Sequence, residues 1–174
     1  MTENYDPFDV KELQEILDDY KVGASVMWKD IGPRVTQYVV SLPDGGKISS
    51  IKRIEQEIAL LLGVVSVRVF PIPSIPAVGI EVPNEKPETV KIKDILNDSH
   101  YETVAQLAKA SCSFSKIPFG IGKNAIGNVI IGDLKEMPHL LVAGQTGAGK
   151  SMFLNTLIIS LLKNSTPKNC ILCL

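Results

Sequence analysis

The sequence has few cysteines and no apolar run long enough to cross a membrane. Its three cysteines, Cys112, Cys170 and Cys173, are an odd number, which suits a reducing compartment better than a disulfide framework. The uncharged stretches of the first half, such as Ile58–Val67, are far shorter than the ~20 apolar residues of a membrane-spanning helix. The first nine residues lack the basic and apolar regions of a targeting signal. We therefore expect a cytoplasmic location and no membrane contact from this segment.

An excess of basic charge is also missing, since 18 lysines and arginines face 19 acidic residues. The balance is uneven, because residues 1–20 hold seven acidic side chains and only Lys11, which leaves a net charge of +5 on residues 21–174. That excess is scattered and includes no basic run. Charge alone therefore gives no argument for a nucleic-acid surface.

The apolar content of 45% is that of a globular protein, and residue patterns predict a small α+β domain over residues 1–110. Apolar residues at helical spacing follow a capping box at Asp9, and alternating residues predict strands further on. The expected helices are 9–21, 49–62 (ended by Gly63), 90–96 and 101–110, and the expected strands are 25–28, 36–42, 64–70 and 78–82, with an extended proline-rich loop at 71–76.

Residues 111–174 have a different pattern, which predicts a second domain. Two hairpin strands, 119–121 and 129–131, precede an apolar run at 139–143, an apolar helix at 152–162 and another apolar run at 171–174. Two apolar strands joined by a helix are typical of a parallel βαβ unit. In such a strand Cys170 and Cys173 point to opposite faces, so we interpret them as structural residues and not as metal ligands.

The segment Gly144–Ser151 matches the complete phosphate-binding P-loop pattern, G-x-x-x-x-G-K-S/T. Glycines allow positive φ and bring backbone N–H groups close to phosphates, and the following helix adds the positive end of its dipole. Lys150 is the expected catalytic residue, placing its ammonium near the β- and γ-phosphates of ATP, and Ser151 is the expected Mg²⁺ ligand. The predicted cofactor-binding residues are Gly144, Gln145, Thr146, Gly147, Ala148, Gly149, Lys150, Ser151 and Met152.

A P-loop ATPase also needs an acidic residue at the end of a second core strand. The last acidic residue here is Glu136, which precedes the P-loop. Two strands and one helix cannot bury both faces of a P-loop sheet. The expectation is therefore an incomplete ATPase domain, able to bind a nucleotide but not to hydrolyse it.

The stretch from Met137 into the P-loop resembles the FtsK/SpoIIIE family of bacterial DNA translocases. The resemblance extends over residues 5–174 and includes the segments Gly32–Tyr38, Ser49–Gly63, Val67–Arg68, Pro71–Pro76 and Ile80–Asn84. Gln145 and Ala148 depart from the residues usual in the division translocases, which leaves the subfamily open.

The resemblance implies a small α/β domain followed by the start of a RecA-like ATPase domain. It also implies a ring hexamer around double-stranded DNA, with ATP between neighbouring subunits, that moves DNA at cell division, sporulation or conjugation. The membrane-spanning part that anchors such a protein is not in this sequence.

Two alternatives remain open from the sequence. One is a conjugative-element or secretion-system ATPase of the same lineage, and the other is a nucleotide-binding assembly module that does not hydrolyse ATP. Outside the P-loop, we expect Trp28 and Tyr38 in the core, and His139 as a structural residue at the edge of a buried strand. Arg34 and Arg68 are interpreted as solvated.

Overall fold

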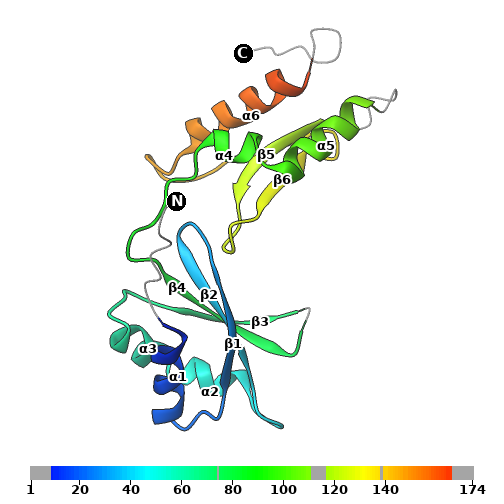
Figure 1. Cartoon of the computed structure of the whole chain (residues 1–174). Coiled ribbons are helices and arrows are strands. Elements are labelled where there is room, and N and C mark those ends of the chain that lie inside the picture. Colours follow the sequence, from blue (N-terminus) through cyan, green and yellow to red (C-terminus); the bar gives the residue numbers. More distant parts are fainter. Residues whose placement is uncertain (1–8, 74, 111–116, 138, 166–174) are drawn as a thin grey trace. The chain divides into compact units, whose positions relative to one another are not determined.

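The computed structural model describes residues 9–73, 75–110, 117–137 and 139–165 (Figure 1). The chain divides into two compact units, one of residues 1–89 with 125–127 and the other of residues 90–124 with 128–174. Each unit is described by itself. The domain boundary expected after residue 110 stays a prediction, because compact units and family domains need not coincide.

The first unit is built on a four-stranded antiparallel sheet with the strand order β1-β2-β4-β3. Its strands are β1 (Ser25–Ile31), β2 (Val35–Ser41), β3 (Arg68–Ile72) and β4 (Ala77–Pro83), and its helices are α1 (Val10–Asp19), α2 (Ile48–Arg53) and α3 (Glu55–Leu61). Apolar side chains of the three helices and the sheet form one core cluster. The predicted α+β character of this region is confirmed.

Helix α1 follows its sequence signals. The Asp9 side chain accepts a hydrogen bond from the Lys11 backbone N–H at 3.4 Å, as an N-cap residue does. Leu13, Ile16 and Leu17 are buried in the core, as their helical spacing predicts.

The helix expected at 49–62 is interrupted at Ile54, which separates α2 from α3. The Ile54 N–H bonds to the carbonyl of Ile51, three residues back, in a tight turn. Such a turn places residues three apart on the same side, so Ile51 and Ile54 both face the core together with Ile58. Gly63 has φ +66°, in agreement with its predicted role as a left-handed C-cap.

Strand β3 is an edge strand and includes Pro71, which the sequence pattern placed in a loop. An edge strand tolerates proline, because its missing N–H is not needed by a neighbouring strand. In the adjacent strand, Gly79 lies under the Phe70 ring, where a Cβ would come within 2.5 Å of a ring carbon. Here a side chain would displace the aromatic ring.

Asn84, just after β4, joins three backbone and side-chain groups of the hairpin β1–β2. Its Nδ2 donates to the Gly32 carbonyl at 2.8 Å, and its backbone N–H donates to the Arg34 carbonyl at 2.9 Å. Its Oδ1 accepts from the hydroxyl of Thr36, which is fully buried, at 2.9 Å. A buried hydroxyl is costly without a partner, so Asn84 satisfies Thr36 and fixes the end of the hairpin.

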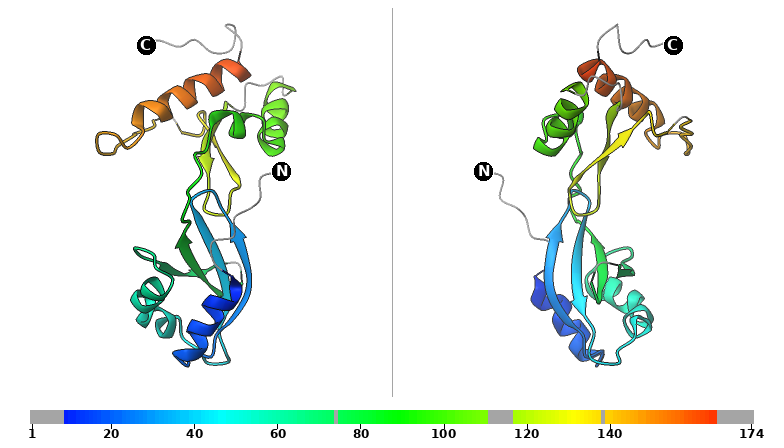
Figure 2. Two further views of the ribbon diagram at one scale, coloured as in Figure 1. Left: turned by 60° about the vertical axis from the view of Figure 1, so that its left-hand side comes forward. Right: turned by 90° about the vertical axis from the view of Figure 1, so that its right-hand side faces the viewer.

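The second unit contains an antiparallel hairpin and three helices (Figure 2). The hairpin strands are β5 (Pro118–Lys123) and β6 (Val129–Asp133), and the helices are α4 (Ile92–Leu96), α5 (Ser99–Ala110) and α6 (Lys150–Asn164). The predicted hairpin and the predicted apolar helix are therefore both present. Side chains of α4, α5 and β6 form its core cluster: Ile95, Leu96, Tyr101, Ala105 and Val129.

The strand predicted at 139–143 is not formed, and this prediction was wrong. His139 and Leu140 are exposed, and Leu141 is 91% exposed. A strand needs a neighbour to bond its backbone groups, and within the described residues both sheets are antiparallel and neither includes this run. The parallel βαβ unit is thus absent from the described residues, and the run 171–174 with Cys170 and Cys173 lies outside them.

Of the two aromatic residues expected in the core, Tyr38 is fully buried, which confirms the prediction. Trp28 is 42% exposed, and its Nε1 donates to Asp30 Oδ2 at 3.2 Å. The prediction for Trp28 was wrong because β1 is an edge strand and contains a bulge between Val26 and Trp28, which disrupts the alternation of faces. In the part of the chain that the structure describes, no helix is long and apolar enough to span a bilayer.

Candidate nucleotide-binding site

The candidate site is the loop 144–149 together with the first turn of α6. The loop turns back on itself through a hydrogen bond from the Ala148 N–H to the Gln145 carbonyl at 3.1 Å. It passes into α6 at Gly149, whose carbonyl accepts from the Phe153 N–H at 2.9 Å as the first bond of the helix. All nine predicted cofactor-binding residues thus lie on one continuous turn at the helix N-terminus.

Two glycines give the loop its shape. Gly147 has φ +83°, and Gly149, the N-cap of α6, has φ +91° and ψ +13° in the left-handed region. A Cβ at either position would meet no atom within 4 Å. Glycine is therefore required here for its backbone conformation and not for lack of space. This is the physical reason for the spacing of the motif.

Lys150 folds over the loop that precedes it. Its Nζ donates to the carbonyl oxygens of Gly144 at 2.7 Å and Gln145 at 2.8 Å. The ammonium is therefore held directly above the turn, where an anion on the loop amides would meet it. Both carbonyls act as acceptors that a phosphate oxygen can replace.

Helix α6 adds a favourable field at the same place. It is 15 residues long, and its N-terminal N–H groups lack intrahelical acceptors and carry a partial positive charge. Its first turn has no acidic residue that would oppose an anion. The loop, the ammonium and the helix end together favour a polyphosphate.

The residues present also fit a magnesium ion that arrives with a nucleotide. The Ser151 side chain is exposed at the first turn of α6 and can supply one hydroxyl ligand. Mg²⁺ in nucleotide sites takes one or two protein ligands and completes its shell with phosphates and water. Among the described residues, no group of three or more His, Cys, Asp or Glu side chains could hold a metal by itself. Met152 is 68% exposed and offers only its backbone to this site.

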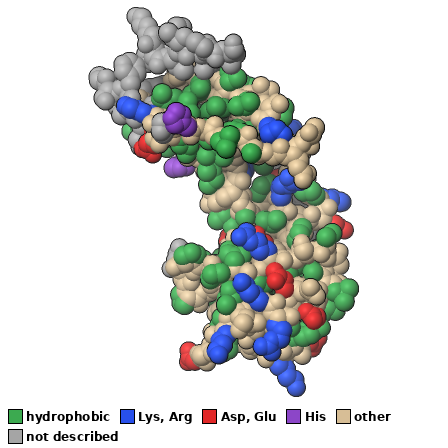
Figure 3. All heavy atoms as spheres, turned by 180° about the vertical axis from the view of Figure 1, so that it is seen from behind, with side chains coloured by type: hydrophobic (Ala, Val, Ile, Leu, Met, Phe, Trp, Pro, Cys, Tyr) green, Lys and Arg blue, Asp and Glu red, His purple; other side chains and the backbone are tan. Residues whose placement is uncertain are grey.

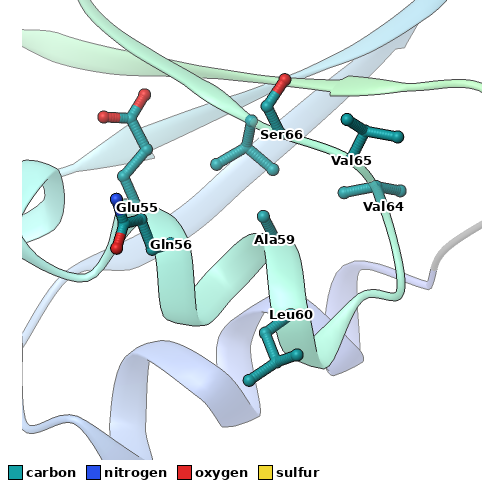
Figure 4. A pocket seen from close by; sticks show the side chains of 8 residues that line it. Glu55, Gln56, Ala59, Leu60, Val64, Val65 and Ser66 are labelled. Atoms are coloured by element: carbon teal, nitrogen blue, oxygen red, sulfur yellow. The ribbon is translucent and has the colours of Figure 1, made fainter.

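A cavity of about 530 Å³ lies elsewhere, in the first unit, between α3 and the chain that leads into β3 (Figure 4). Apolar side chains such as Leu60 and Val65 form part of its wall, together with Glu55. The Glu55 carboxylate already accepts a hydrogen bond from the Val69 N–H at 3.2 Å. Its lining residues include the acidic Glu55 but no lysine or arginine, so the cavity is a poor site for a phosphate.

Charge on the first unit is mixed. On the face shown in Figure 3, basic and acidic side chains are interspersed among apolar ones. Arg68 is paired with Glu81 at 3.4 Å and lies over the Phe70 ring, 5.2 Å from its centroid. A role for Arg68 in DNA contact therefore gains no support, and Arg34 is exposed, as interpreted from the sequence.

Sequence reasoning missed a set of polar residues that hold α6 at its far end. Tyr101 and Ser160 are buried, and both bond within the second unit. The only signal was a serine among the apolar residues of the helix, and one serine does not reveal its partners.

Parts of both units resemble known protein families. Residues 6–84 match the model of the FtsK alpha domain, and residues 102–174 match the model of the FtsK/SpoIIIE family. A DNA translocase FtsK of Caldanaerobacter subterraneus is 38% identical over 159 residues, which are 91% of this chain and 21% of that protein. DNA translocase FtsK proteins of Staphylococcus aureus (strain Mu50) and Mycobacterium leprae are 42% and 41% identical over 89% and 88% of this chain.

The chain spans about a fifth of the length of these curated relatives, since the matched part is 21%, 18% and 17% of each. Among solved structures, the pCW3 conjugation coupling protein TcpA, in its monomer form with ATPγS, matches 90% of this chain at 20% identity and a TM-score of 0.37. The two family models together cover both units and include the P-loop, and the chain therefore belongs to the FtsK/SpoIIIE family.

Proposed function

We propose that this chain is the nucleotide-binding start of an ATP-driven motor that moves double-stranded DNA. The observation that carries the proposal is the geometry of the loop 144–149, where two glycines with positive φ lead into α6 and Lys150 lies over the turn. This arrangement offers amides, an ammonium and a helix dipole to one polyphosphate.

Each residue has a role in this proposal. The loop amides hold the β- and γ-phosphates of ATP, and Lys150 exchanges its two carbonyl partners for phosphate oxygens. The Ser151 hydroxyl would hold Mg²⁺, and the metal would neutralise part of the phosphate charge. Gly147 and Gly149 allow the backbone to approach the phosphates.

DNA as the substrate, and a ring hexamer as the assembly, are supported by family membership. The relatives named DNA translocase FtsK match both units of this chain. Hydrolysis needs a carboxylate near the metal, and the described residues include no acidic side chain beyond Glu136. We assign the hydrolytic step to the whole motor, because this chain spans only about a fifth of the length of its relatives.

Lys150→Ala tests the nucleotide site directly. We expect the 174-residue chain to bind a fluorescent ATP analogue and the variant to lose at least tenfold in affinity, because it loses a charge-assisted contact to phosphate. Lys123→Ala, at the end of β5, is the matched control and should bind like the unchanged chain. Equal binding by the Lys150 variant, with its fold shown intact by circular dichroism, would remove the assignment.

The motor function is tested in the longer form. Its rate of ATP hydrolysis should rise when duplex DNA is added, because a translocase couples ATP hydrolysis to movement along DNA. If the protein binds ATP but its rate of ATP hydrolysis does not change when DNA is added, the assembly module is favoured over the motor.

A further inference from the structure

Helix α6 carries the P-loop at its N-terminus but is held mainly near its C-terminus. Ser160 is fully buried and Leu161 is 3% exposed, whereas Met152 and Leu154, near the N-terminus of the helix, are 68% and 47% exposed. Toward the loop, Phe153 packs against Phe119 with ring centroids 6.3 Å apart, nearly at right angles. One face of α6 is formed by four residues at helical spacing, Phe153, Leu157, Ser160 and Asn164.

On that face, Tyr101 of α5 meets α6. The Asn164 Nδ2 donates to the Tyr101 hydroxyl oxygen at 2.6 Å, and the Ser160 hydroxyl lies near the same oxygen. Within α6, Ser160 Oγ donates to the Thr156 carbonyl at 2.8 Å. The Tyr101 hydroxyl therefore accepts a bond from α6 beside a serine that is anchored to its own helix.

Two further bonds strengthen this end. Ser160 Oγ accepts from the backbone N–H of Gly120 in β5 at 3.4 Å, and Lys163 Nζ donates to the Leu96 carbonyl at the end of α4 at 2.8 Å. We give the name α6 clamp to three side-chain groups at this end of the helix: the Tyr101 hydroxyl, the Ser160 hydroxyl and the Asn164 amide. It ties the helix to α5 and β5 through directional bonds, whose geometry is more restrictive than apolar packing.

We propose that Tyr101 is a positioning residue of the nucleotide site, which fixes the rotation of α6 and so the placement of Lys150 and Ser151. This proposal rests on the proposed nucleotide function of the loop. The two ends of the 15-residue helix are about 20 Å apart, and a helix transmits rotation along its length. A turn of about 10° moves an atom ~6 Å from the axis by ~1 Å. A misplacement of that size can cost up to ~100-fold in a reaction.

The burial of Tyr101 supports the same view. The side chain is 1% exposed, and burial raises the pKa of its hydroxyl, while the hydrogen bonds to Ser160 and Asn164 act in the opposite direction. The hydroxyl is therefore protonated at neutral pH, and its oxygen accepts the bond from Asn164. An apolar residue of similar shape would fill the same space without fixing the helix.

Tyr101→Phe in the 174-residue chain tests the proposal, because it removes the hydroxyl and keeps the ring. We expect the backbone amide NMR signals of residues 147–152 to shift without any ligand, and affinity for a fluorescent ATP analogue to fall about threefold to tenfold. Tyr20→Phe is the matched control, since Tyr20 is 43% exposed at the end of α1. Asn164→Ala keeps the Tyr101 ring and should change the same signals to a smaller extent.

The outcomes separate the two proposals. If the unchanged chain does not bind the analogue, the proposed function fails, and the amide signals of the loop still decide the role of Tyr101. If Tyr101→Phe lowers the midpoint of urea unfolding but leaves both the loop signals and the affinity unchanged, Tyr101 is only structural and the inference is overturned. If that variant does not fold, Asn164→Ala decides in the same way.

Discussion

At the scale of single residues, the P-loop depends on backbone conformations that only glycine adopts easily. Gly147 and Gly149 have φ +83° and +91°, and neither has a neighbour that a Cβ would touch. The glycines and Lys150 could be identified from the sequence because the motif fixes their residue types and spacing, and the glycines are needed for positive φ. The partners of Lys150 could not, since carbonyl acceptors belong to the backbone and leave no mark in the residue pattern.

Gly147→Ala is expected to weaken nucleotide binding without a comparable loss of stability. The loop is exposed, so the variant can relax when it is empty, but binding requires the positive φ, which costs an alanine about 1–2 kcal/mol. Affinity for an ATP analogue, measured by calorimetry, should fall about fivefold to thirtyfold.

Gly45→Ala is the control for this change. Gly45 has φ +76° in a turn of the first unit and also has open space around it. It introduces the same backbone strain away from the loop, so affinity should stay unchanged. An equal loss of affinity in both variants would show that strain anywhere in the chain acts on binding.

At the scale of elements, periodic patterns predicted well wherever an element has one buried side. Helix α1 follows such a pattern, and Tyr38 of β2 is buried as expected, whereas α6 was predicted from a continuous apolar run. The patterns failed where long-range context decides. The run 139–143 is apolar enough for a strand but has no strand beside it among the described residues, and Trp28 lies on an edge strand with a bulge.

The segments Gly32–Tyr38 and Ile80–Asn84 supported the family resemblance, and the structure shows that they meet. Asn84 bonds to Gly32, Arg34 and Thr36, so the two motifs form one structural feature that closes the sheet. Sequence alone places these residues far apart, and no periodic pattern predicts a bond between side chains at such separation.

Asn84→Ala should lower the free energy of unfolding by about 1–3 kcal/mol, because it leaves the buried Thr36 hydroxyl without its acceptor. Adding Thr36→Val removes that hydroxyl, so the double variant should lose less than the sum of the two single losses. Urea unfolding of all four proteins measures this difference. Strictly additive losses would mean that the Thr36–Asn84 bond contributes nothing to stability.

At the scale of the whole molecule, the two units match two different family models, and nucleotide and DNA are expected to meet only in the longer form. The net charge of this chain is −1, and the charges on the face in Figure 3 are mixed. Neither the net charge nor this face therefore indicates a DNA-binding surface.

The affinity of the longer form for duplex DNA should fall as salt rises, because contacts to DNA phosphates release bound counterions. A plot of log affinity against log salt should have a negative slope of about 0.9 for each phosphate contacted. Fluorescence anisotropy with a labelled duplex measures it. The 174-residue chain, measured alongside, should bind much more weakly, and an equal affinity would place the DNA contact within residues 1–174.

The contacts of Lys150 with Gly144 and Gln145 have one more consequence, which concerns selectivity among anions. The carbonyl oxygens of Gly144 and Gln145 already bond to the Lys150 ammonium. An incoming anion must replace them, so its net gain in binding free energy is only the difference between its own contacts and those it displaces. Inorganic phosphate or sulfate offers a single tetrahedral group and little advantage in that competition. A triphosphate reaches the ammonium and the loop amides at once, so the proposed site is expected to prefer a polyphosphate to these small anions.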